Sequence, residues 1–351
     1  MHEQLRQFLK AQWPDAEHVA VEDFAIIAGG YSEETFRFDC RVRRGGGEEV
    51  IPMILRKDPP PAVNILPTSR EQEHRLLQRV REHTRIPVSR SYFVAQERHT
   101  FGEPAMLIER MPGSGQVSEL FHGGPCAHMA ESVATDLCEL IAELHLADHR
   151  ALNADGALDD PRGAGIDTSS WDRYMETTFD YYINGYEAGA FVPLPNVMDV
   201  YLEMRRRKPR PLHLTVVHGD FNPSNFLYKD GKVTALIDWE NTHIGDPRED
   251  LGWMKQMDLL SNTDIMGSVK VDGGFIGHYN RITGFDVTEE EVEYFRLFGT
   301  ANIAIPVLSA VKRRCDKEAM ELLTLYIIQP ALVSTIAWAQ MLGYPMPTGG
   351  N

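Results

Sequence analysis

The chain of 351 residues predicts an α+β fold with two lobes, an N-terminal antiparallel β-sheet with a helix and a mainly α-helical C-terminal lobe. Residues 18–56 contain apolar segments separated by glycine turns, which is typical of a strand meander. From about residue 128 the apolar residues recur at spacings of three and four, which indicates helices. Pro112-Gly113 marks the boundary, so we expect lobes over residues 1–110 and 111–351.

The expected elements of the first lobe follow one another closely. Residues 1–13 combine charge with apolar positions and predict an amphipathic helix rather than a signal peptide. Ser69 can cap the later helix, and Gly45-Gly46-Gly47 forms a turn. Strands are expected over His18–Ile27, Thr35–Val42, Val50–Leu55, 91–96 and 104–110, and the helix over Ser69–Val80.

The second lobe has one expected hairpin among its helices. Residues 150–168 are rich in Ala, Gly and Asp and predict a loop. Short strands over Asn225–Tyr228 and Val233–Ile237 flank Asp230-Gly231, a dipeptide typical of tight turns. This hairpin is expected to fold Asp238 back beside Asn225. Beyond Asp250 the pattern is helical to the end.

Composition restricts the class of partner. The net charge is −16 and the isoelectric point about 5.3, which argues against nucleic-acid or anionic-membrane binding by the whole surface. The four cysteines lack zinc spacing and predict reduced thiols in a cytoplasmic protein. Residues 322–346 carry no charge, but Pro330 interrupts them, so we expect two core helices rather than a membrane span.

The main chemical motif is His218-Gly219-Asp220-x-x-x-x-Asn225, followed thirteen residues later by Asp238. This spacing is that of a kinase catalytic loop, in which one carboxylate accepts the proton of a substrate hydroxyl and the other groups bind magnesium. We therefore predict Asp220 as catalytic base and Asn225 and Asp238 as Mg²⁺ ligands. His218 is a rival base, but anchoring of the loop is the preferred interpretation. Asn222 before Pro223 favours a turn.

The first lobe is expected to hold a nucleotide. Gly29, Gly30 and Ser32 join two strands and let the backbone approach phosphates closely. Arg56 ends the third strand, where kinases place a phosphate-binding Lys, and Lys57 is its runner-up on the other face. Glu73 is the expected partner of Arg56 on the following helix.

Two further features bear on nucleotide binding. Glu71 competes with Glu73 for the role of helix partner. No G-x-x-x-x-G-K-[ST] motif is present, so the chain is not a P-loop protein. Residues 107–111 would form the hinge between the lobes, where adenine binds the backbone.

The acceptor is expected against the helical lobe near Trp239, Glu240 and Asp246, where acidic residues would suit an amine.

At these residues the chain resembles the aminoglycoside phosphotransferase and choline kinase-like superfamily, which has a protein-kinase-like fold. The resemblance runs in family order over about residues 25–255. Its motifs are Gly29-Gly30-x-Ser32, Ile54-Leu55-Arg56, Glu73, Ile108-Glu109-x-Met111-x-Gly113, Leu140-x-x-x-Leu144-His145, His218-Gly219-Asp220-x-x-x-x-Asn225, Ile237-Asp238-Trp239-Glu240 and Gly245-Asp246-Pro247-x-x-Asp250-Leu251.

The resemblance implies a role for each matched residue. Arg56 and Glu73 would handle nucleotide phosphates, Glu109 and Met111 would belong to the nucleotide site, and Asp250 would brace the catalytic loop. The run Leu55 to Pro59 is similar to a branch sometimes fused to acyl-CoA dehydrogenases. Glu33 stands where many relatives have Asn, and a carboxylate there repels phosphates unless it points away.

The sequence therefore predicts a small-molecule kinase, a monomer or homodimer, that transfers the γ-phosphoryl group of ATP or GTP to a hydroxyl of an aminoglycoside-, choline- or sugar-like acceptor. Three alternatives stay open: a nucleotide-binding pseudokinase with a regulatory role, a protein kinase and a Mg²⁺-dependent hydrolase. Asp250 follows Asp238 by only twelve residues, which leaves little platform for a peptide substrate.

Overall fold

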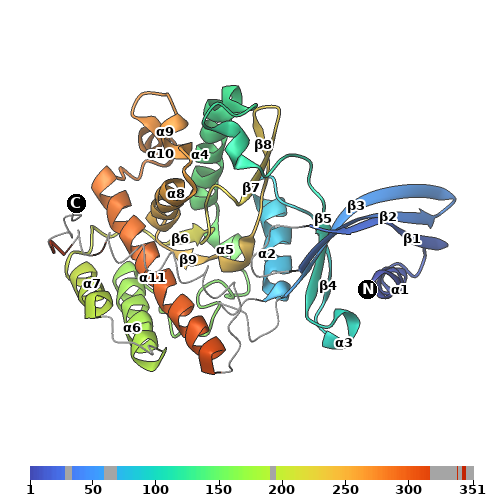
Figure 1. The fold of residues 1–351 in the computed structure, drawn as a ribbon, viewed down its shortest axis with the longest axis horizontal. Helices are drawn as coiled ribbons and strands as arrows, with labels where there is room; N and C mark the ends of the chain where they lie inside the picture. Colours follow the sequence, from blue (N-terminus) through green and yellow to red (C-terminus); the bar gives the residue numbers. More distant parts are fainter. Residues whose placement is uncertain (28–33, 59–68, 190–194, 317–337, 339–341, 345–351) are drawn as a thin grey trace, which may run out of the picture.

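The computed structural model describes residues 1–27, 34–58, 69–189, 195–316, 338 and 342–344, arranged as a β-sheet lobe and a helical lobe (Figure 1). The α+β class and the two kinds of lobe agree with the sequence prediction. The boundary after residue 110 stays a prediction. Among the described residues, no helix combines the length and the apolar character needed to cross a bilayer.

The N-terminal lobe is a five-stranded antiparallel sheet in the order β1-β2-β3-β5-β4. The strands lie within two residues of the predicted bounds at most ends. Helix α1 packs on one face of the sheet through Leu5 and Leu9, which are fully buried. The elements are α1 His2–Gln12, β1 His18–Ile26, β2 Glu34–Arg44, β3 Gly47–Lys57, α2 Arg70–His83, β4 Ser91–Ala95, α3 Arg98–Phe101 and β5 Ala105–Glu109.

Helix α2 lies between the sheet and the helical lobe (Figure 1). Ser69 caps it as predicted, because its hydroxyl accepts a hydrogen bond from Gln72 N at 3.4 Å. Leu76, Leu77 and Val80 bury their side chains in a core that continues into the second lobe. The two lobes therefore share one apolar core on this side of the sheet.

The helical lobe surrounds two small sheets. Its elements are η1 Val117–Leu120, η2 Ala127–Met129, α4 Ala130–Leu146, α5 His149–Leu152, α6 Trp171–Gly189, α7 Pro195–Arg206, β6 Thr215–Val217, β7 Phe226–Lys229, β8 Lys232–Leu236, η3 Trp239–Asn241, β9 His243–Gly245, α8 Arg248–Ser261, α9 Ile265–Ser268, α10 Gly274–Thr283 and α11 Glu289–Asp316. Strand β6 pairs with β9 and β7 with β8. The sequence patterns did not predict β6, β9 or the short helix α5.

The predicted hairpin is present as β7 and β8. Its turn residues Asp230 and Gly231 both have positive φ, 51° and 77°, which is the turn geometry that matches strand twist. Beyond the paired strands, Ile237 N donates to Asn225 O at 3.0 Å. The backbone therefore brings Asp238 next to Asn225, as the spacing predicted.

Helices α8 and α11 pack closely at Gly252. A Cβ atom added at Gly252 would lie 2.4 Å from both Arg296 N and Phe295 C, which are backbone atoms of α11. Only glycine lets the two helices approach to this distance. This contact holds α8, which carries Asp250 and Trp253, against the long helix.

We expect Gly252→Ala to lower the free energy of unfolding by about 1–3 kcal/mol, the usual effect of overpacking a tight contact. Gly47→Ala is the matched control, because a Cβ there meets only Arg44 O at an ordinary 3.7 Å. Urea denaturation of both variants measures the effect. Equal stability of Gly252→Ala and wild type would contradict the assigned contact.

Candidate active site

The catalytic loop runs between β6 and β7 and is held by Asp250 of α8. The Asp250 carboxylate accepts hydrogen bonds from His218 N at 2.7 Å and Gly219 N at 2.9 Å. His145 Nε2 donates to the same carboxylate at 3.1 Å, and Tyr279 bonds the other ring nitrogen of His145. Burial favours the neutral acid, but the hydrogen bond and charge of His145 hold the pKa of Asp250 below its ordinary value.

Gly219 fits the loop because it has no side chain. Its φ is +79°, and a Cβ atom would lie 2.2 Å from Asn241 O. His218 is fully buried beside Trp239, where its Nε2 donates to Ile237 O at 3.1 Å and its Nδ1 accepts from Asp220 N. Burial lowers the pKa of His218, which favours the neutral ring. These contacts agree with the predicted anchoring of the loop.

Asp220 lies near the start of this loop, three residues after β6, and its carboxylate accepts from three side-chain donors. Asn222 Nδ2 and Trp253 Nε1 donate to Oδ1 at 2.8 and 2.6 Å, and Asn225 Nδ2 donates to Oδ2 at 2.8 Å. Burial, reinforced by the nearby Asp238 carboxylate, raises the pKa of Asp220 to about 6 despite these donors. The carboxylate is thus oriented and is a stronger base than an exposed Asp.

Asn225 and Asp238 offer the oxygen atoms that a magnesium site needs. The amide nitrogen of Asn225 faces Asp220, so its amide oxygen is the atom that can bind a metal. Asp238 has the left-handed conformation (φ 68°, ψ 60°), which is rare outside glycine and concentrates at functional sites. Asn222 uses its amide oxygen to accept Ser224 N at 2.7 Å, as expected for a turn residue.

Arg56 connects the two lobes. Its guanidinium donates to Glu73 Oε1 at 2.7 Å and to Asp238 Oδ1 at 2.8 Å. The alternatives weighed from sequence lie elsewhere: Lys57 pairs with Glu34 on the other face, and Glu71 contacts Arg75 and Gln96. The side-chain pair is therefore Arg56 with Glu73. Its role toward nucleotide phosphates stays a prediction.

The sequence patterns did not indicate Arg70 as a residue of the site. It opens α2, where the helix dipole disfavours a cation. Three carboxylates surround it: Asp58 at 2.5 Å, Glu73 at 2.6 Å and Glu240 at 3.2 Å. An arginine at the first position of a helix, preceded by no acidic neighbour within ten residues, is the one sequence signal that could have indicated a tertiary partner.

The cluster of Arg56, Arg70, Asp58, Glu73, Asp238 and Glu240 carries four carboxylates against two guanidinium groups. Burial and the Asp238 carboxylate raise the pKa of Glu240 to about 7. A divalent cation at Asp238 and Asn225 would compensate this excess of negative charge. The hard oxygen ligands and the charge both fit Mg²⁺.

The other nucleotide-site predictions are only partly described. Gly29, Gly30 and Ser32, together with Glu33, lie outside the described residues. Glu109 ends β5; its backbone N–H donates to Arg90 O at 2.8 Å, and its carboxylate lies beside Arg81 at 3.9 Å. Arg110 N donates to Pro52 O, so both of these hinge N–H groups are engaged within the protein. Met111 follows at a partly buried position.

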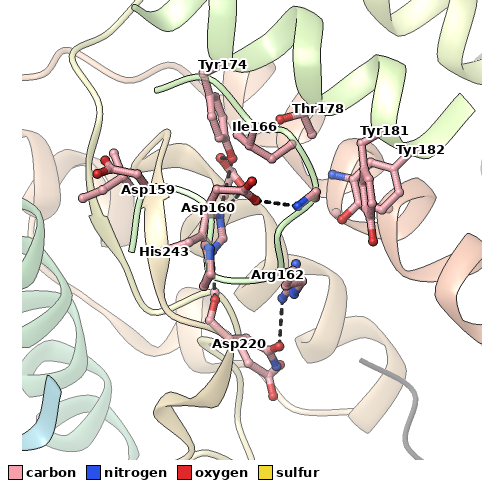
Figure 2. A pocket seen from close by; sticks show the side chains of 18 of the residues that line it. Asp159, Asp160, Arg162, Ile166, Tyr174, Thr178, Tyr181, Tyr182, Asp220 and His243 are labelled. Atoms are coloured by element: carbon pink, nitrogen blue, oxygen red, sulfur yellow. Dashed lines mark hydrogen bonds and ion pairs between the residues drawn. The ribbon is translucent and has the colours of Figure 1, made fainter. Parts of the chain in front are cut away.

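A cavity of about 320 Å³ opens beside Asp220, between α6, residues 159–166, β9 and α8 (Figure 2). Arg162, from the predicted loop, reaches Asn241 Oδ1 at 2.9 Å. Asp160 accepts Ala164 N and Gly165 N, both at 2.8 Å. The side chains of its aromatic wall are Tyr174, Tyr181, Tyr182 and Trp253.

Trp239, Glu240 and Asp246, near which the acceptor was expected, do not line this cavity. Trp239 is a core residue, 2% exposed. Asp246 is fully buried and paired with Arg248. Glu240 belongs to the Arg56 and Arg70 cluster. Proximity along the chain suggested all three, but the tertiary fold turns them away from the cavity.

The profile of the phosphotransferase enzyme family matches residues 23–284. The chain belongs to this family. The resemblance seen in the motifs is thereby confirmed, as is the phosphotransferase class of enzyme. The matched range holds the catalytic loop, Asp238, Asp250 and the cavity wall of α8.

Known relatives of this phosphotransferase are distant. The chain is 24% identical over 258 residues to acyl-CoA dehydrogenase family member 10 of Mus musculus, covering 72% of the chain and 22% of that protein. It is 23% identical over 231 residues to the probable acyl-CoA dehydrogenase IBR3 of Arabidopsis thaliana, covering 64% and 26%. The chain thus spans about a quarter of the length of these curated relatives.

Solved structures share the fold. A putative aminoglycoside phosphotransferase from Ralstonia eutropha superposes with a TM-score of 0.66 at 18% identity, covering 98% of this chain and 99% of that one. A thermostable mutant of aminoglycoside phosphotransferase APH(4)-Ia, complexed with ADP and hygromycin B, gives 0.59 at 14% identity over 95% and 98%. The predicted kinase-like fold is confirmed.

We expect Asp250→Asn to lower the free energy of unfolding by about 3–5 kcal/mol, because it leaves the buried N–H groups of the catalytic loop without an anion. The new amide also has an N–H₂ group in place of one oxygen, and this donor must face at least one of the three donors to Asp250, which are His218 N, Gly219 N and His145 Nε2. Asp286→Asn, at an exposed position, is the control. Chemical denaturation measures both, and a loss within ~0.5 kcal/mol for Asp250→Asn would contradict the assigned brace.

Proposed function

We propose that this phosphotransferase moves the γ-phosphoryl group of ATP or GTP to a hydroxyl of a small acceptor that binds in the cavity beside Asp220. The observation that carries the proposal is the placement of one oriented, partly buried carboxylate at the edge of that cavity, next to Asn225 and Asp238. The acceptor hydroxyl would lie against Asp220, and the nucleotide would lie between the lobes at Arg56.

Asp220 acts in this scheme as the base. Its carboxylate accepts the proton as the hydroxyl oxygen attacks the γ-phosphorus and the bond to the bridging oxygen of the nucleoside diphosphate breaks. Arg56, held by Glu73, contributes positive charge to the phosphates. When bound, Mg²⁺ neutralises the charge on the phosphate oxygens, and Asn225 and Asp238 would hold it.

Several finer assignments belong to this proposal. Gly29, Gly30, Ser32, Glu109 and Met111 would complete the nucleotide site. Structures that share the fold were solved with ADP, AMP-PNP and GDP, which supports a nucleotide co-substrate. Hygromycin B in three of the similar structures supports an aminoglycoside-like acceptor among the classes considered. We further propose a cytoplasmic enzyme, as a monomer or homodimer.

A screen with γ-labelled ATP and GTP tests the reaction itself. Aminoglycosides, macrolides, choline, sugars and hydroxy acids are offered as acceptors, and labelled product is separated from free phosphate. Transfer to any acceptor supports the kinase. Free phosphate without phosphorylated product indicates a hydrolase, and nucleotide-dependent thermal stabilisation without turnover indicates a pseudokinase.

We expect Asp220→Asn to reduce acceptor phosphorylation by about 10²–10⁴-fold, because the amide cannot accept the proton. Nucleotide affinity should change little, since Arg56, Asn225 and Asp238 are retained. Steady-state kinetics and nucleotide titration measure the two effects. Asp272→Asn, an exposed residue, serves as control, and near-normal turnover of Asp220→Asn would refute the assignment of the base.

We expect Asp238→Ala to weaken Mg²⁺-dependent nucleotide binding as well as the rate. Titration of a fluorescent nucleotide with and without Mg²⁺ measures the dependence. Glu240→Gln is the matched control: it removes a carboxylate 3.7 Å from the same Arg56 nitrogen but leaves the proposed ligand in place. The assignment is wrong if both variants keep the Mg²⁺ dependence of the wild type.

A further inference from the structure

Trp253 contacts the catalytic carboxylate and also lines the acceptor cavity. Its indole Nε1 donates to Asp220 Oδ1 at 2.6 Å, the shortest of the three side-chain hydrogen bonds to Asp220. Its ring belongs to the wall of the cavity on α8. The proposed phosphoryl transfer assigns this residue no part, although it touches the base directly.

The hydrogen bonds distinguish the two oxygen atoms of Asp220. Oδ1 accepts from both Trp253 and Asn222, which occupies its two lone pairs. Oδ2 accepts only from Asn225 among these side chains. The carboxylate group otherwise rotates over a broad, two-fold potential. The bond from Trp253 therefore fixes which oxygen retains a lone pair for a substrate hydroxyl.

The position of Trp253 is itself constrained by α8 and α11. It follows Asp250 by three residues, so both side chains leave the same face of α8 toward the catalytic loop. Asp250 holds the backbone at His218 and Gly219, and Trp253 holds the side chain of the next residue. On α11, a Cβ at Gly299 would lie 3.3 Å from Trp253 Cε3, so the indole fills the space that glycine leaves.

We propose that Trp253 is a positioning residue for the transfer: by occupying Oδ1 of Asp220 it presents Oδ2 to the acceptor hydroxyl. This inference rests on the proposed role of Asp220 as base. A ring that only formed the cavity wall would act through its shape, and phenylalanine would replace it. A ring that orients the base acts through its N–H, which phenylalanine lacks.

The kinetic test compares Trp253→Phe with wild type, using the acceptor found in the screen and saturating Mg-ATP. We expect kcat to fall by about 10–100-fold, the effect of a misplaced reacting group, while the KM for ATP stays unchanged. Trp13→Phe in the N-terminal lobe is the control and should keep wild-type kinetics. An unchanged kcat, or a change confined to the KM of the acceptor, would overturn the proposal.

A spectroscopic test needs no acceptor. The chain has five tryptophans, and ¹⁵N-labelling gives one indole N–H resonance for each. The resonance missing in Trp253→Phe belongs to Trp253. We expect it far downfield in wild type and shifted upfield in Asp220→Ala at the same pH; no response to Asp220→Ala would overturn the proposal.

The two tests separate this inference from the proposed function. Suppose that the Trp253 resonance responds to Asp220→Ala but that Asp220→Asn keeps normal turnover. The hydrogen bond from Trp253 to Asp220 would then be supported, and the role of Asp220 as base would be refuted. That result would also overturn the role of Trp253 in transfer. A lower kcat in Trp253→Phe, with the spectral response present, supports both.

Discussion

The buried Asp250 carboxylate is the interaction on which the catalytic site depends. A loop that leaves two successive N–H groups inside a protein needs an acceptor for both, since an unpaired buried donor is strongly unfavourable. Asp250 meets this need, and His145 and Tyr279 stabilise its charge in turn. Because the anion belongs to α8, the position of the loop follows the packing of that helix against α11.

A second constraint is electrostatic and lies where the lobes meet. Arg56 reaches from β3 to Asp238, and Arg70 reaches from α2 to Glu240. These ion pairs join the sheet, helix α2 and the turn that holds Asp238 and Glu240 through side chains rather than backbone. Four carboxylates face two guanidinium groups there, so an additional cation would stabilise the cluster. Arg56, which supports the contact between the lobes, is also the arginine expected at the nucleotide phosphates.

The sequence predicted most of the local geometry of the site. The Asp230-Gly231 turn determines the hairpin, and the hairpin determines the approach of Asp238 to Asn225. Positions that depend on distant packing were missed. Arg162 comes from a segment with loop composition, and Trp253 lies on a helix with no local cue for Asp220. Trp239 and Asp246 were assigned to the acceptor site because they follow the motif, yet the fold buries them.

The cavity beside Asp220 has two walls of unlike origin. One wall, the catalytic loop and α8, is tied to Asp250, Trp253 and the close contact at Gly252, so few substitutions there leave the chemistry intact. The opposite wall, residues 159–166 and the tyrosines of α6, donates none of the hydrogen bonds that Asp250 accepts, and its Tyr174 donates instead to Glu249 of α8 at 2.6 Å. With the acceptor bound in this cavity, as proposed, changes on that opposite wall would alter the choice of acceptor while leaving the residues of the proposed phosphoryl transfer in place.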